Sequence, residues 1–420
     1  MEFRSIYGTG DILPEDSFKW QHIEEKVKKI MAFYNYKEIR TPIFESTQLF
    51  SRSIGEDTDI VRKEMYTFLD QGKRSLTLRP EATASVVRAY LEHNLGKVFP
   101  LVKLYYIGPM FRQERPQKGR LRQFHQFGAE AIGSLDPLVD AELIELSTRI
   151  HHDLGIEDYT LHLNSIGCKK CRSAHRDLFI KFIKDRFENF CSECQLRLNR
   201  NPLRIFDCKK EGCVKILAFA PKMIDFLCEE CRTHFEKVKS YLKKLGIEYK
   251  EDPSLVRGLD YYTKTVYELK SSLLGAQDTL CGGGRYDLLI EELGGEQTPA
   301  MGFSAGMERI LLVLELKKKK FGEDERLDFF ICPLGQGAKE KALKLIKDIR
   351  KKNLRSDMDY LNRSLKSQMK EANRQKAKKV LIIGEEELKK GVIILKDMES
   401  GEQKEIGMNE LLNEILSYEQ

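Results

Sequence analysis

Long apolar stretches are missing from this sequence of 420 residues. A membrane-spanning helix needs about 18 consecutive apolar residues. The longest run here, around Ile310 to Leu316, is broken by Glu315. The start, Met1 to Ser5, also has no secretory apolar region. We therefore expect a soluble protein of the cytoplasm and no membrane association.

Cysteine is scarce outside one segment, since eight of the ten lie between Cys168 and Cys231. Without a secretory signal, disulfides are disfavoured and metal ligation becomes the leading alternative. The eight form the pairs Cys168-x2-Cys171, Cys191-x2-Cys194, Cys208-x4-Cys213 and Cys228-x2-Cys231. Two such pairs can complete a tetrahedral zinc site. We expect at least one structural zinc ion, with reduced core cysteines as the alternative; the pairing cannot be read from the sequence.

A large excess of one charge is also absent: 71 Lys and Arg against 65 Asp and Glu leave +6, with a pI of 8.6. Such a chain is compatible with a polyanionic partner, but a mixed-charge surface explains the balance equally well. Charge therefore permits RNA binding without demonstrating it. The length predicts two or three domains, and 41% hydrophobic residues are enough to build their cores.

The first 160 residues alternate between helical and extended patterns. Apolar residues at helical spacing predict amphipathic helices over residues 16–34 and 136–154. Strands are expected over residues 38–44, 75–78, 101–106 and 124–129. Pro42 inside the first of these strands indicates a sheet edge or an interface, because proline cannot donate a hydrogen bond to a neighbouring strand.

Residues 165–243 are rich in Cys, Lys and Phe and are interpreted as an inserted module. After them we expect strands over 263–270 and 279–281, and a glycine-rich strand that runs into a helix over 302–316. The lysine run at 317–320 is taken as the domain boundary. Beyond it, the patterns predict strands over 327–332, 380–384 and 392–396, with helical stretches over 338–351 and 366–379. This alternation predicts a small α/β domain with a mixed sheet.

The segment from Tyr105 to Glu130 has a charged loop between two predicted strands. Its cations are Arg112, Arg115, Lys118, Arg120 and Arg122. Guanidinium groups at the mouth of a hairpin match phosphate oxygens. A solvated basic turn is the alternative for this segment taken alone.

Other segments give the chain a recognisable pattern. They are LRPEAT (78–83), LVRGLDYYTKTVYE (255–268), GGGRYD (282–287) and MGFSAGMERILLVL from Met301. With the charged hairpin, these strings resemble the signature segments of histidyl-tRNA synthetases: motif 2, the two histidine-specific motifs and motif 3. The opening residues Gly8, Thr9, Asp11 and Pro14 are similar to that family's start, and the first helix with the Pro42 strand resembles motif 1. One departure is Ala82, where many relatives carry glycine.

The resemblance covers nearly the whole chain and implies an α+β architecture. It implies a class II synthetase catalytic core on an antiparallel sheet (residues 1–320), interrupted by the Cys-rich module and followed by an α/β anticodon-binding domain (326–420). It also implies histidine–tRNA ligase activity, in which ATP with Mg²⁺ activates histidine, and the histidine is then transferred to the 3′ end of tRNA(His). Motif 1 implies a homodimer in this family.

The chemistry of activation needs charge stabilisation more than a base, because the histidine carboxylate itself attacks the α-phosphate. The resemblance assigns Arg112 and Arg257 to that phosphate, Arg309 to the γ-phosphate, and Arg120 to ATP. It assigns the α-amino group of histidine to Glu81, Thr83 and Gln126, and the side-chain pocket to Glu130, Tyr262 and Tyr286. Salt bridges for the arginines and packing for the tyrosines are the alternatives. His125 is interpreted as a hydrogen-bonded strand residue without a catalytic role.

Two other protein classes compete with this reading. The first is the family's non-charging paralogue, a regulatory subunit of a histidine-biosynthetic phosphoribosyltransferase, which typically lacks the C-terminal domain and has degraded histidine-specific residues. The second is a zinc-dependent RNA-binding module without enzymatic activity, against which Arg112, Arg257 and Arg309 argue. Pyrophosphate exchange separates the three cases.

Overall fold

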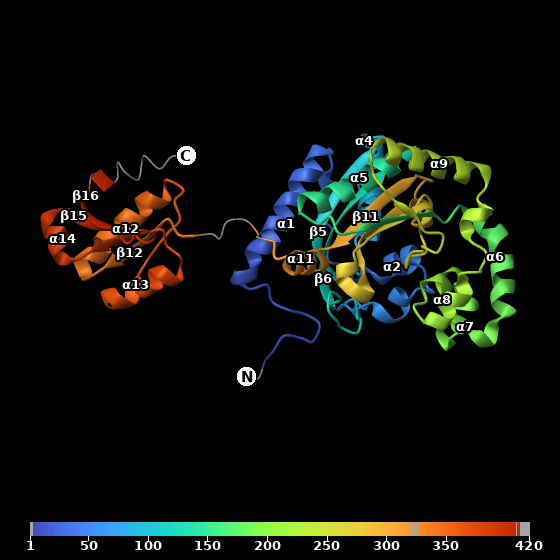
Figure 1. The fold of residues 1–420 in the computed structure, drawn as a ribbon, viewed down its shortest axis with the longest axis horizontal. Helices are drawn as coiled ribbons and strands as arrows, with labels where there is room; N and C mark the ends of the chain where they lie inside the picture. Colours follow the sequence, from blue (N-terminus) through green and yellow to red (C-terminus); the bar gives the residue numbers. More distant parts are fainter. Residues whose placement is uncertain (1–2, 320, 322–325, 409, 412–420) are drawn as a thin grey trace. The chain divides into compact units, whose positions relative to one another are not determined.

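The computed structural model describes residues 3–319, 321, 326–408 and 410–411, and the chain divides into two compact units, Met1–Phe321 and Gly322–Gln420 (Figure 1). This division falls directly after the lysine run at 317–320, of which Lys320 lies outside the described residues. Among the described helices, none combines the length and the apolar character needed to cross a membrane.

An eight-stranded sheet forms the centre of the first unit. Its strands, in spatial order, are β1 (Lys37–Glu38), β5 (Val102–Phe111), β6 (Gln123–Ile132), β11 (Ala300–Gly306), β10 (Thr279–Arg285), β9 (Thr263–Lys270), β7 (Thr160–Ser165) and β8 (Lys250–Glu251). All neighbours are antiparallel except the short outer pairs β1–β5 and β7–β8. The predicted antiparallel core is confirmed.

Helices α1 (Pro14–Phe33), α5 (Pro137–Asp153), α9 (Glu229–Lys244) and α11 (Met307–Leu316) pack together and share one core with this sheet. Pro14 stands in the first turn of α1, where its missing N–H costs no hydrogen bond. Asp136 caps α5 by accepting from the N–H of Leu138 at 2.9 Å. The two predicted helices are confirmed, although α1 begins at Pro14, before its predicted start at residue 16.

A second, three-stranded sheet contains β2 (Phe44–Ser46), β4 (Ser75–Leu78) and β3 (Thr67–Leu69). The prediction of one strand over 38–44 is wrong, because β1 and β2 lie in different sheets. The guanidinium of Arg79 bonds the backbone between them, donating to the carbonyl of Thr41 at 3.0 Å. Around this sheet lie α2 (Thr47–Ile54), the π-helical turn Ile60–Glu64, α3 (Thr83–Glu92) and α4 (Leu95–Val98).

The Cys-rich insertion connects β7 to α9 and is helical. It contains α6 (Lys169–Lys184), α7 (Ser192–Leu198), α8 (Glu211–Leu217) and short 3₁₀ turns at Phe187–Asn189, Pro202–Asp207 and Met223–Phe226. Figure 1 shows α6, α7 and α8, drawn in green, gathered at one edge of the first unit. They enclose a small core in which the rings of Phe179 and Phe206 stack at 4.8 Å. Two short elements complete this unit, the 3₁₀ segment Ser272–Gln277 and α10 (Leu289–Glu292).

The second unit is built on a mixed sheet, as predicted, but the sheet has five strands where the sequence indicated three. Its order is β13 (Ser356–Met358), β12 (Phe329–Pro333), β14 (Lys379–Ile383), β15 (Val392–Asp397) and β16 (Gln403–Gly407), with helices α12 (Gln336–Arg350), α13 (Leu365–Arg374) and α14 (Glu385–Lys390). The predicted helical stretch 366–379 is too long, since α13 ends at Arg374 and Lys379 begins β14.

Candidate active site

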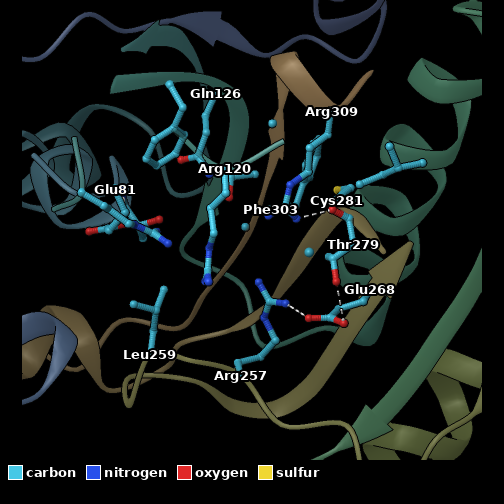
Figure 2. Close-up of a pocket in the computed structure, with 18 of the residues that line it drawn as sticks. Glu81, Arg120, Gln126, Arg257, Leu259, Glu268, Thr279, Cys281, Phe303 and Arg309 are labelled. Carbon is cyan, nitrogen blue, oxygen red and sulfur yellow. Dashed lines mark hydrogen bonds and ion pairs between the residues drawn. The ribbon is translucent and has the colours of Figure 1, made fainter. Parts of the chain in front are cut away.

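A cavity opens over strands β5, β6, β9, β10 and β11, between the start of α3 and the start of α11 (Figure 2). Nine of the ten predicted substrate-site residues line it: Glu81, Thr83, Arg112, Arg120, Gln126, Arg257, Tyr262, Tyr286 and Arg309. The tenth, Glu130, lies behind the wall. Residues from five separate segments of the sequence thus converge on one cavity.

The β5–β6 hairpin carries two of the arginines. Arg112 donates from Nε to the carbonyl of Pro80 at 3.0 Å, and its guanidinium lies over the ring of Phe124 at 5.4 Å. Arg120 pairs with the buried carboxylate of Glu114. Arg122 instead bonds to backbone carbonyls of Glu114 and Tyr7. These contacts hold the arginines of the hairpin against the protein, so the hairpin is not a solvated basic turn.

Arg257 precedes β9 and pairs with Glu268 on that strand (Figure 2). Burial acts to lower the pKa of Arg257, but the Glu268 carboxylate together with Tyr262 and Tyr261 outweighs it and raises that pKa overall, so the guanidinium stays charged. Its guanidinium lies 5.6 Å from the centre of the Tyr262 ring, and its buried Nε has no hydrogen-bond partner in the described part of the chain. Glu268 was not predicted. The sequence feature that could have identified Glu268 is an acidic residue inside a partly apolar strand.

Arg309 lies in the first turn of α11 and is anchored by backbone. Its Nε donates to the carbonyl of Gly119 at 3.0 Å and its Nη1 to the carbonyl of Thr279 at 2.6 Å. Burial lowers the pKa of Arg309, and the neighbouring cations Arg120 and Arg112 lower it further. Figure 2 shows Arg120, Arg257 and Arg309 extending into the same space. Cations that repel one another in a partly closed cavity favour a polyanionic ligand.

The opposite end of the cavity presents acceptors. The buried carboxylate of Glu81 accepts from the N–H groups of Thr83 at 2.7 Å and Ala84 at 2.9 Å, which fixes it at the start of α3. Burial raises the pKa of Glu81, and the hydrogen bonds oppose that shift. The side-chain oxygen of Gln126 is buried and lacks a partner among the residues that the structure describes. Together, Glu81 and Gln126 can receive an ammonium group.

Glu130 stands on β6 beneath this end. Its two carboxylate oxygens accept from the hydroxyls of Thr83 at 2.8 Å and Tyr286 at 2.6 Å. Burial raises the pKa of Glu130 to about 8, although both hydrogen bonds oppose the rise. A Cβ at Gly302 of β11 would come within 1.6 Å of this carboxylate, so the glycine makes room for it. Glu130 therefore acts on the cavity through Thr83 and Tyr286.

The structure also shows the surroundings of three further residues in these segments. The predicted hydrogen-bonded strand position of His125 is confirmed, because its Nδ1 lies 3.0 Å from Glu308 and its ring packs on Trp20. Ala82 adopts an ordinary right-handed backbone (φ −105°, ψ −21°), so its methyl group causes no strain. Arg285, within GGGRYD, is fully buried and pairs with Asp140 of α5, which gives it a structural role.

The eight cysteines of the insertion form two groups of four. One contains Cys168, Cys171, Cys228 and Cys231, and the other contains Cys191, Cys194, Cys208 and Cys213. Within each group all sulfur atoms lie within 4.8 Å of one another. All ten cysteines of the chain are free thiols. Either group offers the ligand set of a tetrahedral zinc site.

An antiparallel sheet that carries an arginine-lined cavity, with a mixed α/β unit after it, defines a class II aminoacyl-tRNA synthetase. The family model for histidyl-tRNA synthetase matches residues 8–170 and 213–310, and an anticodon-binding-domain model matches residues 328–418. The chain belongs to the histidyl-tRNA synthetase family.

Individual relatives match over nearly the full length. A histidine–tRNA ligase of Halothermothrix orenii is 51% identical over 99% of both chains, and one of Desulforamulus reducens is 50% identical over 96% of this chain and 97% of its own. The crystal structure of apo S. aureus histidyl-tRNA synthetase superposes with a TM-score of 0.83 at 44% identity, covering 98% of this chain and 99% of that one. The insertion and the second unit are thus within the matched length.

Proposed function

We propose that this protein is a histidine–tRNA ligase, which activates histidine with ATP and transfers it to the 3′ end of tRNA(His). The observation that carries the proposal is one cavity lined by four arginines and by buried acceptors. Such a cavity aligns a cationic amino group and a polyphosphate, which are the two charged ends of the reactants. Close relatives that bear the name histidine–tRNA ligase support the same activity.

In the first step the carboxylate of histidine attacks the α-phosphorus of ATP, a P–O bond forms, and the bond to pyrophosphate breaks. No proton moves from the nucleophile, so the site supplies alignment and charge stabilisation. Arg112 and Arg257 hold the α-phosphate in this proposal, Arg309 holds the γ-phosphate, and Arg120 contacts ATP. Mg²⁺ enters with ATP and offsets phosphate charge.

Amino-acid choice rests on the acceptor end of the cavity. Glu81, Thr83 and Gln126 bind the α-amino group, while Tyr262 and Tyr286 enclose the imidazole, with Glu130 bonded to Tyr286 from behind. Buried polar groups of this kind reject a wrong amino acid strongly, because it leaves them without partners.

In the second step a ribose hydroxyl at the 3′ end of tRNA attacks the adenylate carbonyl, and AMP leaves. We assign residues 1–320 to catalysis, with the insertion over about 165–243, and residues 326–420 to anticodon binding. Helix α13 places exposed basic side chains on the second unit, which suits contacts with an RNA backbone.

The proposal includes a homodimer in the cytoplasm with structural zinc in the insertion. Phe44, Phe68 and Leu69 of the three-stranded sheet expose 44% to 67% of their surface, and an apolar patch of this kind suits contact with a second copy. Ten free thiols suit a reducing compartment.

Charging of tRNA(His) with labelled histidine tests the whole reaction. The expected result is ester-linked histidine on tRNA(His), and far less on a tRNA for another amino acid. Binding of tRNA without any charging would instead support an RNA-binding protein, and failure to bind or charge would support the non-catalytic paralogue.

A further inference from the structure

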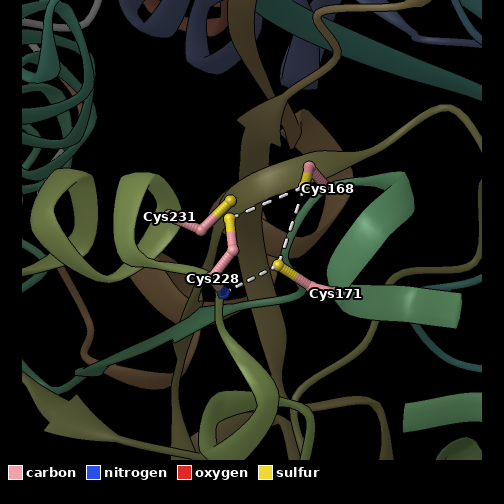
Figure 3. A group of neighbouring side chains, drawn as sticks. All are labelled: Cys168, Cys171, Cys228 and Cys231. Atoms are coloured by element: carbon pink, nitrogen blue, oxygen red, sulfur yellow. Dashed lines mark hydrogen bonds between the residues drawn. The ribbon is translucent and has the colours of Figure 1, made fainter. Parts of the chain in front are cut away.

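The cysteine group at the base of the insertion has the geometry of a tetrahedral thiolate site (Figure 3). The sulfur of Cys168 lies 3.6 Å from that of Cys171 and 3.9 Å from that of Cys228. A zinc ion with Zn–S bonds of about 2.3 Å places its four sulfurs about 3.8 Å apart. A disulfide needs about 2.05 Å between sulfurs. The observed spacing fits the metal site and excludes a bond.

The second group repeats this geometry farther out in the insertion. The sulfurs of Cys191 and Cys208 lie 3.9 Å apart. The backbone N–H of Cys191 donates to the sulfur of Cys213 at 3.4 Å, as the N–H of Cys228 donates to the sulfur of Cys171 at 3.2 Å in the first group. Donors aimed at sulfur stabilise a thiolate in preference to a thiol.

Each group ties together segments that are distant in sequence. Cys168 precedes α6 and Cys228 precedes α9, so the first group closes the insertion at its base. Cys191 precedes α7 and Cys208 follows the 3₁₀ turn Pro202–Asp207, so the second group fixes the outer loop between them. Lysines beside the ligands, at 169–170 and 209–210, offset the net −2 charge of a zinc ion with four thiolates.

Residues next to both groups reach the loop that carries Arg257 and Tyr262. Arg172, directly after Cys171, donates to the backbone carbonyl of Tyr262. Asn201, in the loop fixed by the second group, donates to the carboxylate of Asp260 at 2.6 Å. This loop, residues 252–262, has no strand or helix of its own, so contacts of this kind decide its position.

Arg204 joins the second cysteine group to a neighbouring turn by ion pairs. Arg204 lies 3.4 Å from Asp207, the residue before Cys208, and 3.5 Å from Asp59 of the neighbouring turn. Arg204 therefore links the outer cysteine group to the turn at Asp59, while Asn201 links it to the 252–262 loop.

We propose that each cysteine group binds one zinc ion through four thiolates, and that the two ions position the 252–262 loop for binding of histidine. Zinc binding releases the thiol protons to solvent. This role rests on the proposed ligase function, whereas the two metal sites do not depend on it. The cysteines are ligands and Arg172 and Asn201 are positioning residues, none of which touches substrate.

The test begins with metal content of the full-length chain, measured by elemental mass spectrometry after dialysis. We expect two zinc ions per chain in the wild type and in Cys332→Ser, a control whose thiol lies in the second unit. Cys208→Ser should retain one ion, and Cys208→His should restore the second, because imidazole also ligates zinc. Fewer than two zinc ions per wild-type chain, or disulfides within the groups, would overturn the proposal of two metal sites.

The second part separates positioning from folding. Asn201→Ala removes only the bond to Asp260, so it should keep two zinc ions and a normal melting temperature. Its histidine KM in pyrophosphate exchange should rise about 3- to 10-fold, the effect of one lost hydrogen bond. An unchanged histidine KM in both Asn201→Ala and Cys208→Ser would overturn the positioning role. Two zinc ions in a wild-type chain without exchange activity would refute the ligase function alone.

Discussion

Replacing Arg257 by alanine removes the cation that faces the α-phosphate in our proposal. Arg257 is partly buried against Tyr262 and pairs with Glu268. Loss of one preorganised charge contact of this kind costs about 10² to 10³ in rate, or about 3 to 4 kcal/mol. We therefore expect histidine-dependent ATP–pyrophosphate exchange to fall by at least that factor.

The same change also leaves the carboxylate of Glu268 without its main partner. Two unit charges 4 Å apart interact by about 4 kcal/mol at an effective dielectric constant of 20. Lys270 at 3.4 Å and the hydroxyl of Thr279 at 3.2 Å offset only part of this charge. Repulsion between Glu268 and ATP could thus imitate the loss of a direct contact.

A double variant, Arg257→Ala with Glu268→Gln, separates the two effects because it restores the net charge without restoring the guanidinium. If Arg257 contacts the phosphate, exchange stays low in the double variant. Arg257→Lys is the matched control, which keeps the charge but loses the planar fork and should recover only part of the rate. Near-normal exchange in Arg257→Ala, or full recovery in the double variant, would remove Arg257 from phosphate binding.

Three further predictions concern specificity, RNA and stability. Above pH 8, Glu130→Gln should raise the histidine KM about 3- to 10-fold, with little change in the ATP KM, because two hydroxyls lose a charged acceptor. The difference in histidine KM between Glu130→Gln and the wild type should widen as the pH rises through about 8, where the wild-type carboxyl ionises. An unchanged histidine KM with a lowered melting temperature would contradict the pocket assignment. A chain ending near Lys320 should still exchange pyrophosphate but charge tRNA poorly, and equal charging would refute an anticodon role. Asp140→Asn should cost about 3 kcal/mol in urea unfolding, because the buried Arg285 loses its shorter ion pair and keeps only the one with Asp287 at 3.2 Å. Burial raises the pKa of Asp140, but Arg285 and His234 lower it overall. The contribution of Asp140 to stability is therefore present above its unfolded pKa of about 4 and is lost as the pH falls through its folded pKa. Equal stability of wild type and Asp140→Asn at neutral pH would show the ion pair to be dispensable.

The regular elements were predictable where one physical signal dominated. Strand β9 was predicted with its observed bounds because alternation and β-branched residues agree over 263–270. The prediction of one strand over residues 38–44 was wrong because Pro42 and the side chain of Arg79 divide this segment between two sheets, which is a tertiary effect. The short strand β13 carries no pattern long enough to detect.

The cavity residues came from resemblance to a family, since spacing along the chain gives no distances in space. Sequence could not show that Glu130 lies behind the wall, because Gln126 and Glu130 occupy the same face of β6 by alternation. The sequence also revealed four pairs of cysteines but not which pairs meet in space. Cys168 and Cys228 are 60 positions apart and come together only through the fold of the insertion.

Pyrophosphate exchange with a panel of all twenty amino acids tests the central claim most directly. The purified full-length chain, ATP, Mg²⁺ and labelled pyrophosphate are combined with each amino acid in turn. We expect labelled ATP with histidine alone, at a rate that Arg257→Ala abolishes. No exchange with histidine, or equal exchange with another amino acid, would contradict the assignment of this cavity to histidine activation.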